Sequence, residues 1–334
     1  MKVYLQCGIC QEDVPDLQRF AVPQNFCIQC YEEHGESQFF YPNDELIHKV
    51  LDDLVLVYDL LEEIYFPDKT LYEKESYAIP IGIALGGLNS DIGISKTTLQ
   101  QLVQEFRTDS LYKKVLPDLN KMIYLNDCQY IVSAIQNTLE DLDNCFIDFY
   151  ISLADVNPLS LASSDDGELI VMSRAGRKCS FCIENYFAKM NAVLDLFCKL
   201  MYEIENPQED FSTIPRLRGH GKTYGKAKNL NIWQTPGTLF EKDNFITMIL
   251  SIRNHVIHNG SLEMSPRVFV VKDKEKIVER YLLVPDIEND HLVQWENRNQ
   301  FYITETKWND FLPKIHKKFL ERTLKTIKYI MGDR

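Results

Sequence analysis

The sequence contains no uninterrupted apolar run of the roughly 20 residues that a membrane helix needs. Its longest weakly polar stretch, residues 78–88, is broken by one proline and three glycines. The opening residues, MKVYLQCGIC, carry one lysine and no apolar core, so they do not resemble a secretory signal. These absences predict a cytoplasmic protein with no membrane partner.

Compositional bias and internal repeats are also absent. Of the 334 residues, 45% are apolar and 25% are charged, which excludes collagen-like, low-complexity and largely disordered chains. At roughly 100–200 residues per domain, this length indicates about two domains.

Charge is unevenly divided along the chain. Residues 1–165 contain 10 basic and 27 acidic residues, whereas residues 166–334 contain 26 basic and 22 acidic residues. The net charge of −13 argues against nonspecific nucleic-acid binding by the whole chain. The second half is nevertheless basic enough to bind a polyanion. The alternative interpretation of this uneven charge is that the acidic first half only keeps the protein soluble.

Four of the nine cysteines form two CxxC pairs, Cys7/Cys10 and Cys27/Cys30, with 16 residues between the pairs. Each pair supplies two thiolates to one cation, and two pairs complete a tetrahedral zinc site. About 30 residues cannot bury a core of their own, so zinc would supply the folding energy. We therefore expect a structural zinc with no open coordination position. Two disulfides or a redox pair are the less favoured alternatives.

The remaining five cysteines lie mostly among apolar neighbours, and we expect them to be small buried side chains. They are Cys128, Cys145, Cys179, Cys182 and Cys198. Cys179 and Cys182 form a third CxxC pair without an obvious partner pair, so a second metal site is the weaker alternative.

Helical periodicity dominates the first half of the chain. Apolar residues recur at helical spacing over 44–65, and two or three further helices are expected over 97–151, with an interruption at Pro117. Proline and glycine break up residues 67–95, and the Ser/Asp-rich residues 154–167 are typical of a linker.

The second half is predicted to be helical with a small β insertion. Helices are expected over 179–205, 243–258 and 308–331, and a long loop over 207–240. Residues 267–272 and 278–284 predict a hairpin, with 300–304 as a candidate third strand. The expected organisation is thus a zinc module (1–36), an acidic helical domain (37–165) and a mainly helical domain (166–334).

The expected loop contains a basic segment that is a candidate RNA-binding element. Its cations are Arg216, Arg218, Lys222, Lys226 and Lys228, and no acid occurs between Phe211 and Phe240. Glycines allow a close approach to phosphate and the cations neutralise it. A P-loop is excluded because the first glycine of its motif would fall at Arg216 and no apolar strand precedes it. A mobile surface loop is the alternative.

The helix expected over 243–258 carries the most informative motif. Its apolar face comprises Phe245, Ile249, Ile252 and Val256, and a polar stripe comprises Thr247, Ser251, Asn254 and His258. Arg253 lies beside the polar stripe. The exposed carbonyls at a helix C-terminus favour a protonated imidazole by about 0.3–1 kcal/mol. His258 is therefore a candidate general acid or base, and Arg253 a candidate phosphate ligand. Arginine and histidine also occur at helix ends as dipole partners alone.

The sequence Arg253-Asn254-x3-His258 resembles the motif of the HEPN superfamily (higher eukaryotes and prokaryotes nucleotide-binding). In that motif an arginine, often followed by a polar residue, precedes a histidine by a short helical interval. The resemblance covers roughly residues 170–334, because a long helix precedes the motif and a final helix follows it. It implies a HEPN-like helical bundle, here with a β-hairpin insertion.

The resemblance implies a metal-independent endoribonuclease, in which the ribose 2′-hydroxyl attacks the adjacent phosphate and leaves a 2′,3′-cyclic phosphate. Arg253 would stabilise the phosphate charge, and His258 would be the acid or base or would orient the 2′-hydroxyl. Asn254 would help to position either of these two side chains. Family sites are composite clefts built from two motifs across a dimer axis, so the single motif of this chain implies a homodimer. Many family members act as toxins or as antiviral and phage-defence nucleases. Glu184 and Lys189 are candidates for an additional charged residue facing the motif. His255 is expected to be structural or peripheral.

Two other functions remain open at this point. A non-catalytic adaptor would combine the zinc module with helices that bind protein or RNA. For the nuclease and the adaptor alike, residues 1–165 are the candidate surface for a protein partner or trigger. Redox sensing through the CxxC pairs is a weaker alternative.

Overall fold

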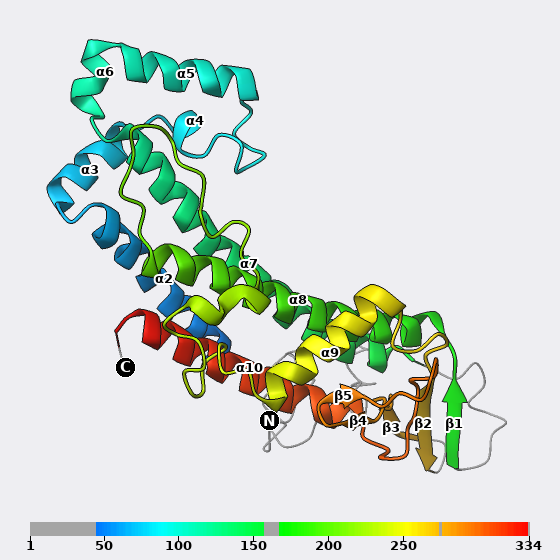
Figure 1. Ribbon diagram of the computed structural model, residues 1–334. Coiled ribbons are helices and arrows are strands. Elements are labelled where there is room, and N and C mark those ends of the chain that lie inside the picture. The colour runs from blue at the N-terminus through cyan, green and yellow to red at the C-terminus, as the bar shows by residue number, and fades with distance from the viewer. Residues whose placement is uncertain (1–44, 157–166, 274–275, 333–334) are drawn as a thin grey trace. The chain divides into compact units, whose positions relative to one another are not determined.

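The computed structural model describes residues 45–156, 167–273 and 276–332 (Figure 1). The described chain is mainly helical with small antiparallel sheets, as the sequence predicted. The zinc-module cysteines and both expected domain boundaries, near residues 36 and 165, lie outside the described residues, so they stay predictions. Within the described part of the chain, no helix is both long and apolar enough to cross a membrane.

The chain forms two compact units, each assembled from separate segments. Among the described residues, unit 1 contains Leu139–Ala192 and Glu241–Thr323 together with the start of the first described helix. Unit 2 contains Val50–Thr138, Val193–Phe240 and the chain from Leu324 onward.

The first half of the sequence supplies most of unit 2. The helices of this half are α2 (Glu45–Tyr65), α3 (Lys69–Ala78), α4 (Ile81–Ala84), α5 (Lys96–Thr108), α6 (Ser110–Val115) and α7 (Leu119–Ala154). From Leu139 onward α7 belongs to unit 1. The helix expected over 44–65 is confirmed, and the two or three helices expected over 97–151 are three, α5, α6 and α7. Helix α3 was missed, because the prolines around it were read as breaks. Asp68 caps its first turn by accepting hydrogen bonds from the N–H groups of Thr70 and Leu71.

Helices α2 and α7 are joined by both apolar and polar contacts. The apolar stripe expected on α2 is half-buried at its ends, Leu46 and Ile64, and fully buried between them, at Val50, Leu54, Val57 and Leu61. The Tyr58 hydroxyl lies 2.7 Å from Ser133 Oγ, and the Tyr65 ring meets Tyr124 edge-on at 5.6 Å. Burial of each aliphatic side chain contributes about 1.5–3 kcal/mol.

Unit 1 contains the N-terminal part of α8 (Arg174–Glu205), all of α9 (Asn244–Asn259) and most of α10 (Trp308–Ile330). An apolar stripe along α8 is buried, and its first two residues lie in unit 1; the stripe comprises Phe187, Met190, Leu194, Phe197 and Met201. His316 of α10 is also fully buried, stacked on Phe146 at 4.4 Å between ring centroids. Helical periodicity therefore predicted all three helices.

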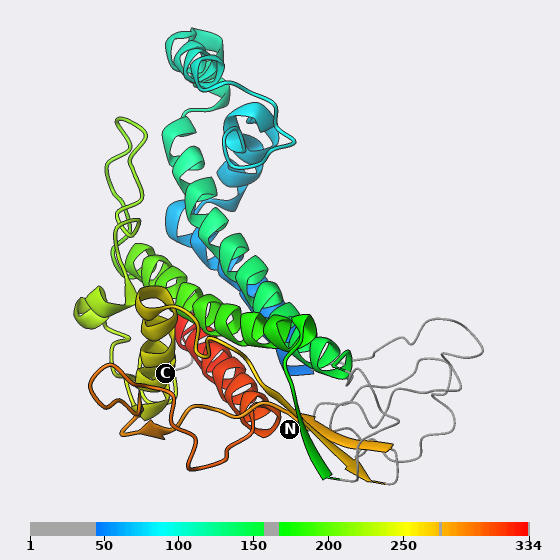
Figure 2. The same ribbon diagram turned by 90° about the vertical axis from the view of Figure 1, so that its right-hand side faces the viewer.

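The sheet of unit 1 has the order β1–β2–β3, as labelled in Figure 1. Figure 2 shows β1 in green beside the two orange strands of the hairpin. Strand β2 (Val268–Asp273) pairs with β3 (Lys276–Tyr281) in the predicted hairpin, and β1 (Gly167–Val171) adds an antiparallel edge that sequence analysis missed. The candidate strand over 300–304 is wrong. The carboxylate of Asp286 accepts the N–H groups of Ile303 and Thr304, so these donors do not join a strand ladder. The two-residue strands β4 (Ile287–Glu288) and β5 (His291–Leu292) form a separate small hairpin.

A buried acid in unit 2 makes stability depend on pH. Glu75 on α3 is fully buried, and its Oε1 has no hydrogen-bond partner among the described residues. Burial, together with the nearby charge of Asp118, raises the pKa of Glu75 from 4.5 to about 7. The folded chain therefore retains a proton that the unfolded chain releases, and stability falls as pH rises from about 4.5 through 7.

Glu75→Gln should remove this loss of stability. At pH 8 we expect the variant to melt roughly 2–4 °C above the wild type, a shift that corresponds to about 1 kcal/mol, and the two should converge near pH 4.5. Thermal unfolding followed by circular dichroism across this pH range measures the difference. The exposed Glu73→Gln on the same helix is the control and should leave the profile unchanged. A variant that is less stable at pH 8 would show that the buried carboxylate is charged and paired.

Candidate functional site

Helix α9 is fixed at both ends by local chemistry. Asp243 caps its N-terminus by accepting the N–H of Ile246, and Arg322 of α10 donates to the same carboxylate at 2.6 Å. Burial disfavours the charged carboxylate, but the hydrogen bonds from Arg322 and Ile246 outweigh it and lower the pKa of Asp243. Gly260 ends the helix with φ of +94°, a conformation that glycine adopts at little cost. The predicted helix and its Asn-Gly ending are confirmed.

The faces of α9 divide as the sequence predicted. Phe245, Ile249 and Ile252 are buried and Val256 is half-buried. On the other side, Thr247 and Ser251 are half-buried, whereas Asn254 and His258 are exposed. The polar stripe therefore opens to solvent at the C-terminal end of the helix.

The motif residues gather at this exposed helix end. Arg253 is half-buried, and its Nη1 donates a 3.0 Å hydrogen bond to Asn254 Oδ1. His258 follows one helical turn after Asn254, in the last turn of α9. The structure thus joins Arg253 to Asn254 directly, and places an exposed imidazole further along the same stripe.

Of the two charged candidates on α8, only Glu184 is bonded next to the motif. Its Oε1 accepts the backbone N–H of Leu262 at 2.9 Å, just after α9 ends. Lys189 instead forms an ion pair with Asp141 of α7 at 2.5 Å. Glu184 is therefore the acid that holds the chain leaving the motif helix.

A polar pocket of about 590 Å³ borders the same helix end in unit 1. Its walls come from the end of α9, the following segment and residues 294–301; they are His255, Asn259, Ser261, Met264, Gln294, Asn297, Arg298, Asn299, Gln300 and Phe301. The side-chain amide of Asn299 lies 3.2 Å from His255 Nδ1. His255, expected to be peripheral to the motif, is thus part of a neighbouring pocket. Sequence analysis missed this pocket, because residues 294–301 have no periodicity or recognised motif.

The basic segment in unit 2 is attached to α8 by a buried acid. Glu203 is fully buried and accepts the N–H of Gly219 at 2.5 Å and the hydroxyl of Tyr124 at 2.6 Å. A Cβ on Gly219 would lie 2.6 Å from the carbonyl oxygen of Lys199. Gly219 therefore lets the segment pack against α8, and its N–H is bonded to a carboxylate.

The cations of this segment mostly face solvent. Arg216, Arg218, Lys226 and Lys228 are exposed, and Lys222 is half-buried with its ammonium 4.5 Å from the centre of the Tyr202 ring. Arg218 also donates to the backbone oxygen of Asn206. The expected loop is irregular except for a short 3-10 helix, η2 (Tyr224–Asn229), which presents Lys226 and Lys228. The structure thus displays the predicted cations on an anchored segment.

The five described cysteines are free thiols. Four are buried and Cys145 is half-buried. Burial raises the pKa of Cys182 and of Cys198 to about 11, so both thiols are protonated at neutral pH. Thiolates are the form that binds metal or attacks disulfides. The described part of the chain contains no cluster of three or more residues suited to holding a metal ion.

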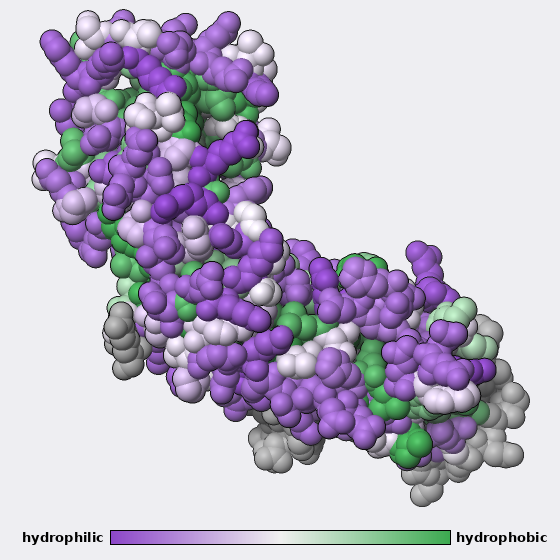
Figure 3. Space-filling model, viewed as in Figure 1, coloured by the Kyte–Doolittle hydropathy of each residue, from purple (hydrophilic) through white to green (hydrophobic). Residues whose placement is uncertain are grey.

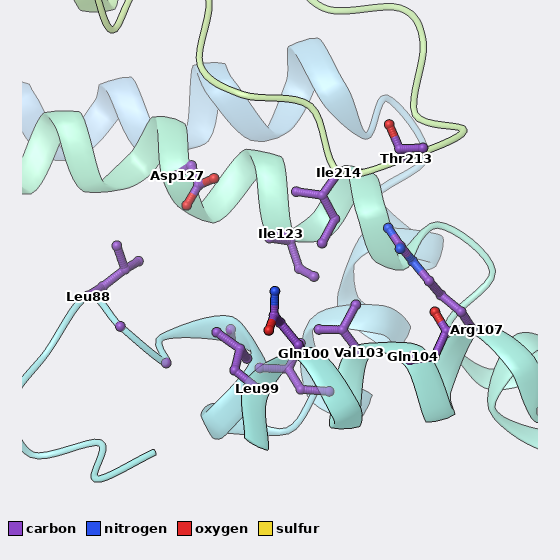
Figure 4. Close-up of a pocket in the computed structure, with 14 residues that line it drawn as sticks. Leu88, Leu99, Gln100, Val103, Gln104, Arg107, Ile123, Asp127, Thr213 and Ile214 are labelled. Carbon is purple, nitrogen blue, oxygen red and sulfur yellow. The ribbon is translucent and has the colours of Figure 1, made fainter. Parts of the chain in front are cut away.

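A second cavity, of about 580 Å³, lies in unit 2 between α4, α5, α7 and residues 213–214 (Figure 4). Apolar side chains, including Leu99, Val103 and Ile123, line it, with Asp127 and Arg107 also on its walls. Burial raises the pKa of Asp127 to about 6. This cavity was also missed in the sequence, because its walls come from segments far apart in the chain.

The two glycines of the Gly219-His-Gly221 segment should respond differently to alanine. Gly219→Ala should lower the free energy of unfolding by about 1–3 kcal/mol, since the new methyl group would collide with a backbone oxygen of α8. Gly221→Ala is the matched control, because a Cβ there meets nothing within 4 Å. Urea unfolding of both variants measures the difference. Equal stability would show that the segment does not pack against α8 in solution.

The described face in Figure 3 is mostly hydrophilic, with apolar residues in small scattered groups. No family model matches the chain, and no curated protein or solved structure matches it either. Any functional conclusion therefore rests on the residues of this chain and their geometry.

Proposed function

We propose that this protein is a metal-independent endoribonuclease of the HEPN type. The observation that supports this function is the exposed end of α9, where Arg253 is bonded to Asn254 and His258 occupies the last turn. RNA cleavage by the 2′-hydroxyl needs proton transfer and stabilisation of the phosphate charge, and an imidazole and a guanidinium on one accessible helix end can supply both. Cleavage of this kind would suit a toxin or a phage-defence effector.

The proposed reaction transfers a phosphoryl group within the RNA, from the 5′-oxygen of the next nucleotide to the 2′-oxygen. The 2′-oxygen forms a bond to phosphorus while the bond to the 5′-oxygen breaks, giving a 2′,3′-cyclic phosphate and a 5′-hydroxyl. His258 accepts the proton of the 2′-hydroxyl, because imidazole exchanges protons near neutral pH. The leaving oxygen takes a proton from a second acid, for which the imidazole of a second copy of the chain is the candidate. This requirement favours a homodimer.

Arg253 is placed to bind the phosphate as its charge increases. A guanidinium has five N–H donors, and the bond to Asn254 uses one nitrogen. The remaining donors can bind two phosphate oxygens in a bidentate manner. Asn254 thus positions Arg253, and Glu184 positions the chain after His258 through Leu262.

The basic segment of unit 2 supplies affinity for RNA in this proposal. Arg216, Arg218, Lys226 and Lys228 are exposed, Lys222 is partly exposed, and all five lie on an anchored backbone. Phosphate contacts supply sequence-independent binding that weakens with salt. A structural zinc bound by Cys7, Cys10, Cys27 and Cys30, and a partner or trigger bound through residues 1–165, complete the proposal.

His258→Ala should abolish cleavage without unfolding the protein, because the side chain is exposed. We expect the rate on single-stranded RNA in EDTA to fall at least about 100-fold, the usual contribution of a general acid or base. The cleavage rate of Arg253→Ala should fall by a similar factor. Gel assays that resolve cyclic-phosphate ends measure both rates.

The exposed His48→Ala on α2 is the matched control and should cleave like the wild type. Cleavage that survives His258→Ala would remove this assignment. A wild type that binds RNA without cutting it, and binds equally well after Arg253→Ala, would instead identify a non-catalytic adaptor.

Replacing Lys226 and Lys228 by glutamine should weaken RNA binding without preference for sequence. If each lysine neutralises one phosphate, the slope of log affinity against log salt should fall by about 1.4, at about 0.7 per contact for single strands. The exposed pair Lys113 and Lys114 on α6, replaced in the same way, is the control. Fluorescence anisotropy with labelled RNA at several salt concentrations measures the slope, and an unchanged slope would place RNA elsewhere.

A further inference from the structure

The polar pocket described above adjoins the motif on the surface of α9. His255 and Asn259 form one stripe at spacing i, i+4, while Asn254 and His258 form the neighbouring stripe. The two stripes are about 100° apart, which is roughly 10 Å around a helix of this diameter. A nucleotide whose phosphate lies at the motif would therefore have its base or its neighbour's base within reach of the pocket.

The chemistry of the walls matches the edges of nucleobases. Asn259, Gln294, Asn297, Asn299 and Gln300 supply side-chain amides, Arg298 supplies a guanidinium, and Met264 and Phe301 supply apolar surface. None of the described residues lining the pocket is acidic. Amides and guanidinium groups read base edges through paired donors and acceptors, and single-stranded bases are the usual targets of sequence-specific RNA recognition.

An aromatic ring lies next to the pocket on the same turn. Trp295 and Arg298 exchange backbone hydrogen bonds of 2.8 and 2.9 Å, with Glu296 between them at φ of +49°. The Arg298 guanidinium lies 5.3 Å from the centre of the Trp295 ring, and Trp295 is 59% exposed. Exposed aromatic rings and guanidinium planes are the surfaces on which unstacked bases pack.

The pocket is also held in place before any ligand arrives. Asn299 contacts His255, and the side-chain amide of Gln300 donates to the carbonyl oxygen of Leu262 at 2.9 Å. These bonds fix residues 294–301 against the end of α9, although 44 residues separate Asn299 from His255 in the chain. Such preorganisation lowers the entropy lost on binding.

We infer that this pocket binds an unpaired nucleobase next to the scissile phosphate, with Trp295 as its stacking surface, and so sets the base preference of cleavage. The inference rests on the proposed function and extends it to substrate selection. Asn297 and Arg298 are the specificity residues, because both are exposed on the pocket wall and neither side chain is hydrogen-bonded to another described residue.

The test uses the full chain and a pool of single-stranded RNA with random sequence. Sequencing of the cyclic-phosphate ends should show that the wild type prefers one base at a fixed position beside the cut. Asn297→Ala and Arg298→Ala should each reduce that preference at least about five-fold, the loss expected for one base contact, while cleavage still depends on His258. The exposed Arg174→Ala at the start of α8 is the control and should keep the wild-type preference.

Different outcomes overturn different conclusions. Cleavage by the wild type with no base preference, or an unchanged preference in both pocket variants, overturns the pocket inference and leaves the nuclease standing. If the wild type does not cut RNA, fluorescence anisotropy with the four homopolymeric tetranucleotides tests separately whether the pocket binds a base. Equal affinities for all four, or no change after Arg298→Ala, would overturn base binding at this pocket.

Discussion

The candidate site depends on how the chain is held just after α9. Leu262 is buried, its N–H is bonded to Glu184 of α8, and its carbonyl oxygen accepts the amide of Gln300. A buried backbone group without a partner would cost about 1–3 kcal/mol, so both bonds are strongly favoured once Leu262 is packed. This one residue therefore connects the end of the motif helix to α8 on one side and to the pocket segment on the other. His258 and the pocket are positioned by the same contacts.

A buried acid plays a comparable role for the basic segment. Glu203 holds Gly219 against α8 by accepting its N–H, and the backbone that carries the surrounding cations is therefore fixed. A lysine on a fixed backbone loses less conformational entropy on binding phosphate than one on a mobile loop. The glycine in this arrangement provides close packing, while the cations provide the charge. The resemblance of this segment to a phosphate-binding loop is thus limited to composition.

The sequence predicted features that depend on local periodicity and could not predict those that depend on distant partners. The faces of α2, α8 and α9 follow from apolar spacing, and the hairpin of β2 and β3 follows from a change of period. Strand β1 was missed because β2, with which it pairs, lies about a hundred residues further along the chain. The candidate strand at 300–304 was wrong because Asp286 captures its N–H groups.

The same distinction applies to the candidate site. Arg253, Asn254 and His258 could be found from sequence, because a helix brings residues at such spacing to one stripe. The role of Glu184 could not be decided from sequence, since its bond to Leu262 spans 78 residues. The motif stripe alone is also open to water, where charge-assisted hydrogen bonds are weaker than in an enclosed site. In the proposed nuclease, bound RNA and a second copy of the chain would exclude that water. A base held in the adjoining pocket would then assist the proposed reaction as well as select its substrate.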